Sequence, residues 1–477
     1  MTFKIDKGPI VGVRHVQVVL LFLGYIAGCM IRLNVSIAVV AMTNAKTSNP
    51  DFPEYDWNTK HKSYIISSIY WGFIIAQPLA AMVCRRFGAK ITMTVAMVIP
   101  SLLCLMTPES IPLGGWQIYC AIRFVEGLFQ GMYFPSIYEH ITNWSPVEEI
   151  TRLGSMAHGG LLIGTILAMM VSGFVAKSSL GWPGISYVSG GIGIIWCVLW
   201  IILADNFPSN SRFIGPKEKS YIISSKKKTN EDKKRIPIPW KSLLTSIPCL
   251  SLKVVIFCQT WTYTTMVSQI PLYMRGVLKL DIKNNALFSG LPFLAMFIMT
   301  YVYLISMEFI MKKNIISLLA LRKTITSLAM WVPSITLLCI GFLDETQKML
   351  AIVLLVVTVG ASAGQNIGTA FNAIDLSPNH SVVIMGIIYI GVSFSALLSP
   401  LVSGIIVKEE GNSDQWQIVF LISSVICFFG NLQYLFFGTD KTQPWNDDDF
   451  LTKKTPDCEK QKDSKSNQIT NVDKHSK

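Results

Sequence analysis

The stretch C-A-I-R-F-V-E-G-L-F-Q-G-M-Y-F-P, residues 120–135, decides the fold of this chain. It holds Arg123, Glu126 and Gln130 inside an otherwise apolar segment, and their spacings of three and seven residues place them on one helical face. The apolar run around them covers residues 113–141. At 1.5 Å per residue, the arginine and the glutamate lie roughly 15 to 20 Å along the run, near the middle of a ~30 Å hydrocarbon layer.

An ionised side chain at that depth costs about 2.5 to 3.5 kcal/mol on insertion scales. A chain that keeps two such residues together is expected to use them, so we interpret this segment as the polar site of a membrane transporter. The alternative is a structural pair, Arg123 and Glu126, that only neutralises itself.

The composition indicates the same class. Of the 477 residues, 51% are hydrophobic and only 15% are charged, too few to cover a soluble globule of this size. The net charge of +12 comes from basic residues in short loops and at the chain ends, at 85–90, 217–241, 312–323 and beyond 441. This distribution fits the positive-inside rule, and we expect a lipid bilayer and no nucleic acid as partner.

The apolar runs predict an all-α membrane protein with about twelve transmembrane helices. An even number places both termini on one side, and the basic clusters indicate that this side is the cytoplasm. The runs cover residues 16–42, 64–84, 91–107, 113–141, 153–176, 183–204, 250–273, 286–311, 325–343, 349–371, 382–407 and 416–437.

The order of these runs divides the chain into two six-helix halves, residues 1–204 and 250–439. A basic central loop, residues 205–249, separates them on the cytoplasmic side, and the polar, lysine-rich tail at 440–477 is expected to be disordered and cytoplasmic. Two six-helix halves are what a major facilitator fold requires, with the substrate site between them near the membrane midplane.

Arg32 is the second candidate substrate ligand. It lies a little over halfway along the first run and Arg123 about a third along the fourth, so the two arginines reach similar depths from opposite sides. With Glu126 as the one carboxylate beside them, such a cavity favours an anion. Arg32 could instead be structural, hydrated by Asn34 and Ser36.

Further candidates come from the second half. Gln365 and Asn366, mid-span in the tenth run, are candidate substrate donors, with structural hydrogen bonding equally open. Tyr263 is a candidate cavity residue, although packing is the commoner role for membrane aromatics. In the fourth run, Gly127 and Gly131 form a small-xxx-small pair that we expect to let another helix approach closely.

Several further motifs are spread along the chain. They are R-L-N-V-S (32–36), Y-W-G-F-I-I-A-Q (70–77), R-F-G-A-K (86–90), the stretch from Arg123 to Pro135, G-W-P-G-I-S-Y-V-S-G-G-I-G (181–193), N-A-I-D-L-S-P (372–378), W-Q-I-V-F (416–420) and Q-P-W-N (443–446). Together they resemble the anion:cation symporter family. That family contains the sodium-phosphate cotransporters, sialin and the vesicular glutamate transporters, and the chain looks most like insect inorganic phosphate cotransporters.

The resemblance implies a secondary transporter that moves an inorganic or organic anion, phosphate favoured, by symport with sodium or protons. It implies that Arg32 and Arg123 serve the anion and that Glu126 serves ion coupling. The second acid of the family's E-G-x-x-E-G pattern is Gln130 here, and the seventh-helix arginine of the glutamate transporters is Gln259. These departures argue against vesicular glutamate transport and leave the coupling ion open.

The resemblance also implies that Glu308 and Arg322 form a gate, because they look like the acidic and basic pair of the facilitator loop motif. We interpret the pair as a latch that holds one state closed without touching the substrate. For coupling, we hypothesise that ionised Glu126 holds Arg123 until an anion competes for it. Glu126 must then be neutralised by a proton or a sodium ion. Gln130 could bind substrate or ion, or could be a packing amide.

Other classes remain to be weighed against transport. The six histidines are scattered, and no metal-ligand or phosphate-cradle pattern accompanies them, so we expect neither an enzyme nor a cofactor beyond the co-transported ion. A non-transporting anion sensor stays open, because the family's P-G-G and P-P-L-E-R segments are altered at 79–81 and 146–150. Proton-coupled export of acidic sugars or amino acids from lysosomes also stays open as an alternative function. We favour a monomeric, multi-pass protein of the plasma membrane.

Overall fold

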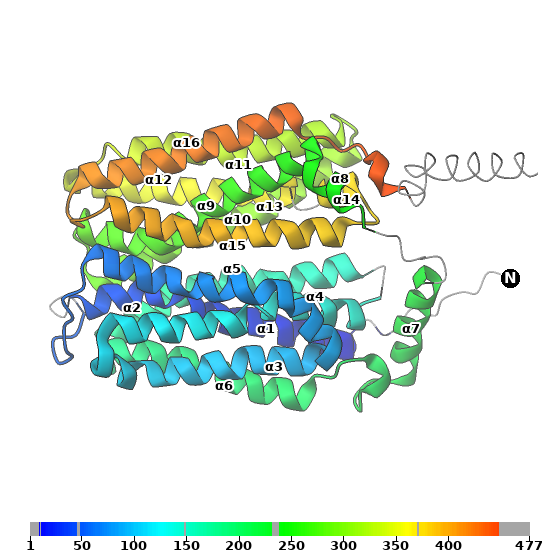
Figure 1. Cartoon of the computed structure of the whole chain (residues 1–477), viewed down its shortest axis with the longest axis horizontal. Helices are drawn as coiled ribbons and strands as arrows, with labels where there is room; N and C mark the ends of the chain where they lie inside the picture. The colour runs from blue at the N-terminus through cyan, green and yellow to red at the C-terminus, as the bar shows by residue number, and fades with distance from the viewer. Residues whose placement is uncertain are drawn as a thin grey trace, which may run out of the picture.

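The computed structural model describes residues 9, 11–44, 48–146, 149–230, 238–369 and 372–447. All regular elements within those residues are helices, arranged in two groups that lie one above the other in Figure 1. The first group consists of α1 (Val13–Leu33), α2 (Val35–Met42), α3 (Thr59–Gln130), α4 (Tyr133–Trp144), α5 (Ile150–Lys177) and α6 (Gly181–Leu203).

The second group follows a connecting segment with η2 (Pro208–Asn210), α7 (Pro216–Asn230) and α8 (Trp240–Thr245). Its contacts with the first group run mainly through three helix pairs, α5 with α10, α3 with α15 and α2 with α9. Its elements are α9 (Ile247–Gly276), α10 (Ile282–Lys312), α11 (Leu318–Ile340), η3 (Glu345–Gln347), α12 (Lys348–Ala361), α13 (Gly364–Thr369), α14 (Asn372–Leu376), α15 (Ser381–Ile406), α16 (Ser413–Phe437) and η4 (Pro444–Asn446).

Glycines divide the 72 residues of α3 into three consecutive rods. The backbone leaves helical geometry at Gly88 (φ +82°) and at the pair Gly114 and Gly115, where Gly115 has φ +59°. Side chains with a Cβ rarely adopt such positive φ values, so glycine lets the chain reverse direction at both places. The helix therefore supplies the second and third spans and, continued by α4, the fourth.

Eight helical stretches of the described residues are long and apolar enough to cross a membrane, judged by length and composition. One of them, Arg86–Trp144, has 59 residues, which at 1.5 Å per residue exceeds twice the hydrocarbon thickness, and Gly114 and Gly115 break it. Over their described residues, all twelve predicted apolar runs fall mainly on helices, so the prediction of an all-α membrane protein with two six-helix halves is confirmed.

The connecting segment contains a docked helix that the sequence did not predict. Glu218 of α7 is buried and accepts hydrogen bonds from the backbone N–H groups of Val13 (2.9 Å) and Arg14 (3.1 Å). These donors belong to the first turn of α1, which has no partner within its own helix. Arg14 also forms salt bridges with Glu218 (3.1 Å) and Glu149 (2.8 Å). The segment is thereby fixed to the first group of helices.

The start of the tail is ordered, which corrects part of the prediction for residues 440–477. Trp445 is buried, Ser377 donates to the side chain of Asn446 at 2.8 Å, and Asn379 donates to the Asn446 carbonyl at 3.0 Å. Burial of a tryptophan ring outweighs the polar composition around it. Residues 448–477 lie outside the described residues.

The hydrophobic core differs between the two ends of the molecule. We call the end with Val13, α7 and η4 the terminal end, and the end with the turns at 177–181, 276–281 and 407–413 the distal end (Figure 1). Toward the distal end, one core cluster joins side chains of both groups, including Met42, Tyr273 and Trp416. Toward the terminal end, the described residues form separate clusters for each group. The two groups therefore meet most closely at the distal end.

Candidate functional site

Arg123 lies where α1 ends. Its guanidinium donates to the carbonyl oxygens of Ile31 (2.9 Å) and Arg32 (2.5 Å), in the last turn of that helix. The last carbonyls of a helix lack partners within it and carry partial negative charge, so a cation stabilises them. This contact agrees with the predicted similar depth of Arg32 and Arg123.

The same guanidinium binds Glu126 at 2.8 Å. The side chains of Arg123 and Glu126 are only 2% and 1% exposed, so the two charges compensate each other in a dry environment. The Nε group of Arg123 has no hydrogen-bond partner among the described residues. Arg123 is thus mostly occupied by the protein itself, in the manner of a structural pair.

The third rod of α3, which carries Arg123, is held close to the first rod of the same helix by glycines. A Cβ at Gly127 would collide with the carbonyl oxygen of Ile69 and lie 3.2 Å from the Cα of Gly72, and a Cβ at Gly131 would lie 2.7 Å from that of Ala76. This close approach confirms the prediction for Gly127 and Gly131. It fixes the face that presents Arg123, Glu126 and Gln130.

Arg32 has a different environment, made mainly of aromatic rings. Its guanidinium lies 5.2 Å from the ring centre of Phe134 and 6.0 Å from that of Phe73, and it donates to the sulfur of Cys29 at 3.4 Å. Arginine stacks favourably on aromatic faces, but no carboxylate of the described residues pairs with it. Arg32 therefore keeps donors available for an anion.

A small cavity adjoins Arg32. Its volume is about 10 Å³, room for roughly one water molecule. The Nε2 amide of Gln130 and the hydroxyl of Tyr133 are buried there without a hydrogen-bond partner among the described residues. Buried donors without acceptors are costly, so this cavity favours an oxygen-bearing ligand or water. The lining residues are Tyr25, Gly28, Cys29, Arg32, Gln130, Tyr133 and Phe134.

The three candidate substrate residues of the second group, Tyr263, Gln365 and Asn366, lie on α9 and α13. Tyr263 of α9 packs against the core cluster that both groups share, and its ring stands edge to face with that of Phe293 in α10 at 6.2 Å. Gln365 is buried, and its amide donates to the carbonyl of Ala329 in α11 at 3.2 Å, which is a bond within the second group. Asn366 lies in α13, but its side chain is outside the described part of the structure. The structure therefore places Tyr263 against the shared core and Gln365 in a bond within the second group.

The predicted latch between Glu308 and Arg322 is not formed in the described state. Glu308 lies on an exposed face of α10 and pairs with Lys312, one helical turn away, at 2.7 Å. Arg322 is 5% exposed and pairs with Asp375 of α14. In this state Glu308 takes a local partner at i+4, and Arg322 takes the half-buried carboxylate of Asp375. Asp375 also accepts from the side-chain amide of Asn372 (3.5 Å), whose Oδ1 accepts from the Tyr434 hydroxyl (3.3 Å).

A different ion pair connects the two groups. Lys62, at the start of α3, bonds Glu410, in the turn between α15 and α16, at 2.5 Å. Lys62 is only 5% exposed, and the neighbouring Thr59 hydroxyl donates to the Lys408 carbonyl at 3.5 Å. Deeper in the interface, Ser393 donates to Gln77 at 2.8 Å. Lys62 and Glu410 thus close the distal end, where the shared core also lies.

Sequence reasoning missed the aromatic surroundings of Arg32, namely Tyr25, Tyr133 and Phe134. A signal was available for Tyr133, which follows Glu126 by seven residues and therefore continues the stripe of Glu126 and Gln130. No local pattern marks Tyr25, because it reaches the cavity through the packing of α1 on other helices.

Comparison with known proteins gives the family. The sequence pattern of the Major Facilitator Superfamily matches residues 21–321 and 315–462. The "Putative inorganic phosphate cotransporter" of Drosophila ananassae is 29% identical over 450 residues, covering 90% of this chain and 93% of the relative. "Sodium-dependent phosphate transport protein 3" of Mus musculus is 29% identical, covering 88% and 93%. "Sialin" of Ovis aries is 26% identical, covering 91% and 90%.

Solved structures show the same fold. The partially occluded inward-open form of the xylose transporter XylE from E. coli aligns with a TM-score of 0.67 at 14% identity, covering 90% of this chain and 99% of that one. A D-xylose-proton symporter aligns with a TM-score of 0.65 at 13% identity, covering 89% and 99%. The chain is therefore a multi-pass transporter, not an enzyme, and it belongs to the Major Facilitator Superfamily and, within it, to the anion:cation symporter family.

Proposed function

We propose that this transporter moves a small anion, with phosphate favoured, by symport with sodium or protons. The observation that carries the proposal is the cavity beside Arg32. Among the described residues, no carboxylate pairs with Arg32 there, and the donors of Gln130 and Tyr133 have no hydrogen-bond partner. Phosphate oxygens accept several charge-assisted hydrogen bonds at once, which suits this donor set. The names of the Drosophila and mouse relatives support phosphate.

We assign ion coupling to Glu126. In the described state its charge is compensated by Arg123, which also holds the end of α1. An anion that draws Arg123 away leaves Glu126 buried and uncompensated, and a proton or a sodium ion then restores neutrality. Coupling follows because each ion lowers the cost of binding the other. Neither a cofactor nor a second chain takes part in this scheme, which a monomer can perform.

The proposed orientation places the terminal end in the cytoplasm of a plasma-membrane protein. Basic side chains gather at that end, including Arg86, Lys90, Lys219, Lys312 and Lys323, as the positive-inside rule expects. In the described state the distal end is closed by the shared core and by Lys62 and Glu410. The cavity at Arg32 is smaller than any anion with its hydration, so the halves must separate for substrate to enter.

An organic anion is the second candidate, as in proton-coupled export of acidic sugars or amino acids from lysosomes. The observation that favours it is the aromatic surroundings of Arg32, since Phe73, Phe134, Tyr25 and Tyr133 offer apolar faces to the carbon part of a ligand. The name of the sheep relative points the same way.

The deciding experiment measures uptake of labelled phosphate into proteoliposomes that contain the purified protein. A sodium gradient and a proton gradient are imposed separately. Uptake driven by either gradient, and lost in an Arg32→Gln variant, supports phosphate symport and names the coupling ion. Absence of phosphate flux under both gradients, with accumulation of an acidic sugar or amino acid by the same vesicles, replaces phosphate with the organic anion. Anion binding without any flux would indicate a sensor of the same fold.

A further inference from the structure

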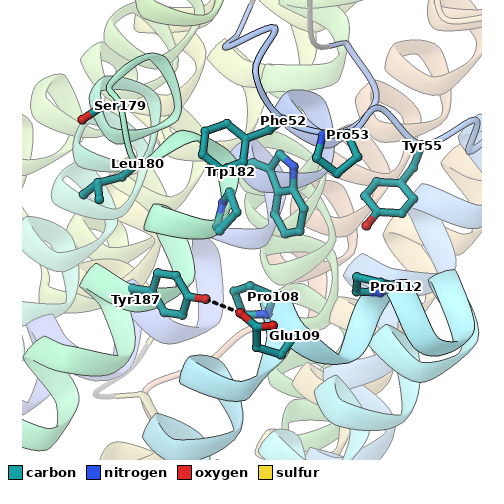
Figure 2. A pocket seen from close by; sticks show the side chains of 11 residues that line it. Phe52, Pro53, Tyr55, Pro108, Glu109, Pro112, Ser179, Leu180, Trp182 and Tyr187 are labelled. Atoms are coloured by element: carbon teal, nitrogen blue, oxygen red, sulfur yellow. Dashed lines mark hydrogen bonds between the residues drawn. The ribbon is translucent and has the colours of Figure 1, made fainter.

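A second, larger cavity lies at the distal end of the first group of helices. Its volume is about 390 Å³, within the range of small-molecule sites, and it shares no lining residue with the cavity at Arg32. Figure 2 shows that its walls come from three separate parts of the chain. These are the loop between α2 and α3 with Phe52, Pro53 and Tyr55, the third span region with Pro108, Glu109 and Pro112, and the turn into α6 with Ser179, Leu180, Trp182, Pro183 and Tyr187.

The walls are fixed in place by contacts between these parts. The Asn49 amide donates to the carbonyl oxygen of Ser178 at 2.8 Å and ties the α2–α3 loop to the turn before α6. Gly181 has φ +57°, and a Cβ there would collide with the ring of Phe52. Only glycine therefore combines this turn with the packing of Phe52. The prolines among the lining residues stiffen the remaining wall, so the cavity is formed before a ligand arrives.

The chemistry of the walls suits a cation with apolar substituents. Four rings, those of Phe52, Tyr55, Trp182 and Tyr187, line the cavity, and Tyr55 and Trp182 stand edge to face at 5.9 Å. Aromatic faces attract ammonium groups, most strongly in tryptophan and tyrosine. Burial raises the pKa of Tyr55, so its phenol is neutral. One face of its ring stacks on Trp57 at 5.0 Å, which leaves the other face for a ligand.

One carboxylate, that of Glu109, faces the cavity from the side opposite Phe52 (Figure 2). The Tyr187 hydroxyl donates to its Oε1 at 2.8 Å and holds it in place. Asp51 and Asp56 flank the lining residues of the α2–α3 loop and are exposed. Among the described residues, Asp51, Asp56 and Glu109 have no salt-bridge partner. This region is therefore locally acidic on a chain with a net charge of +12.

From these observations we propose that the distal cavity binds an organic cation, an ammonium group with apolar substituents. Glu109 neutralises the ammonium, the rings of Tyr55 and Trp182 contact its alkyl groups, and the proline-rich wall contains the apolar remainder. The site is separate from the anion site and does not depend on the proposed transport. Two sources present this chemistry, a free organic ammonium ion and the choline headgroup of a bilayer lipid.

The test uses the purified full-length protein in an uncharged maltoside detergent and the probe hexyltrimethylammonium, with binding measured by titration calorimetry. We expect saturable binding that Glu109→Gln weakens at least tenfold and that Tyr55→Leu also weakens. Glu345→Gln is the matched control, because Glu345 is another distal carboxylate that is paired with Lys279 outside the cavity. Repetition with added phosphatidylcholine separates the sources. Competition by the lipid identifies the headgroup, whereas unchanged affinity identifies a free ammonium ion.

Hexanol controls for simple partition of the alkyl chain. Equal binding of hexanol and hexyltrimethylammonium, or equal affinity of the wild type and Glu109→Gln, would overturn the proposal and leave the rings as interfacial anchors of the helix ends. Labelled-phosphate uptake by Glu109→Gln is expected to match the wild type. Failure of the cation site and failure of anion transport are thus read from separate measurements.

Discussion

Arg123 binds Glu126 at 2.8 Å, and the same guanidinium holds the carbonyl oxygens of Ile31 and Arg32. The two arginines of the site are therefore unequal. Arg123 satisfies the end of a helix and a buried carboxylate, whereas Arg32 contacts aromatic rings and a sulfur atom. We infer that Arg32 meets the anion first and that Arg123 changes partner during transport.

These different roles predict that substitution of Arg32 weakens anion binding, whereas substitution of Arg123 lowers the stability of the protein. Arg32→Gln removes charge-assisted hydrogen bonds worth about 1.5–3 kcal/mol, so labelled phosphate should bind at least tenfold more weakly while the thermal unfolding midpoint stays near that of the wild type. Arg123→Gln leaves Glu126 buried and unpaired, and should cost about 3–5 kcal/mol of stability. Scintillation proximity binding and thermal unfolding in detergent measure the two effects. Equal destabilisation by both variants would contradict these different roles.

Glu126→Gln should separate exchange from concentrative uptake. The amide keeps a hydrogen bond to Arg123 but no longer needs a proton or a sodium ion when the anion arrives, so the two fluxes lose their coupling. Counterflow of labelled phosphate is expected to persist, whereas accumulation against a gradient disappears. Glu345→Gln, on the exposed distal surface, serves as the control and should accumulate phosphate normally. Full accumulation by Glu126→Gln would rule out this role.

The fold could be predicted because the membrane imposes it on the sequence. Apolar runs long enough to span the bilayer need no information about distant contacts, and the charges of Arg123 and Glu126 stand out within one of them. The same reasoning found Gly127 and Gly131, since small residues at one-turn spacing have few other uses in such a helix.

Contacts between distant segments could not be predicted in this way. Asp375 reaches Arg322 from 53 residues away, and Glu218 caps α1 from a helix that is 205 residues away from Val13. Several partners of suitable charge exist for each of these residues, and only the packing of helices selects one. The aromatic surroundings of Arg32 and the distal cavity likewise depend on three or more segments.

At Gly127 the third rod of α3 packs closely on the first rod, so we expect the stability of the protein to be sensitive to substitution there. Gly127→Ala forces a methyl group against the carbonyl oxygen of Ile69, so the helices must move apart at a cost of about 1–3 kcal/mol. Gly191→Ala is the control, because no atom of the described part of the chain lies within 4 Å of a Cβ there. We expect a lower unfolding midpoint for the first variant and no loss for the second, measured by thermal unfolding. Equal midpoints would show that the helices adapt freely.

The pairing of Arg322 with Asp375 leads to a further prediction about stability. Asp375→Asn leaves Arg322 without its carboxylate and should destabilise the protein by about 1.5–3 kcal/mol. Glu308→Gln removes only an exposed pair with Lys312 and should change the unfolding midpoint little. Thermal unfolding of the two variants compares them directly. A larger loss for Glu308→Gln would restore the pairing that chain order suggested.

The ion pair of Lys62 and Glu410 should control access from the distal end. Lys62→Glu places two carboxylates together in the closed state, where Lys62 is 5% exposed, so the equilibrium should shift toward a state in which the distal ends of the two groups separate.

The readout is the labelling rate of Ser63→Cys by a membrane-impermeant maleimide, with Cys339→Ala present to remove an exposed thiol. Ser63 is buried beside Gly404 across the interface, so labelling reports separation. A shift of about 1.4 kcal/mol raises the rate tenfold, and the double variant Lys62→Glu with Glu410→Lys should return it to the wild-type value. Fast labelling in the double variant would mean that the shared core, and not the ion pair, holds this end closed.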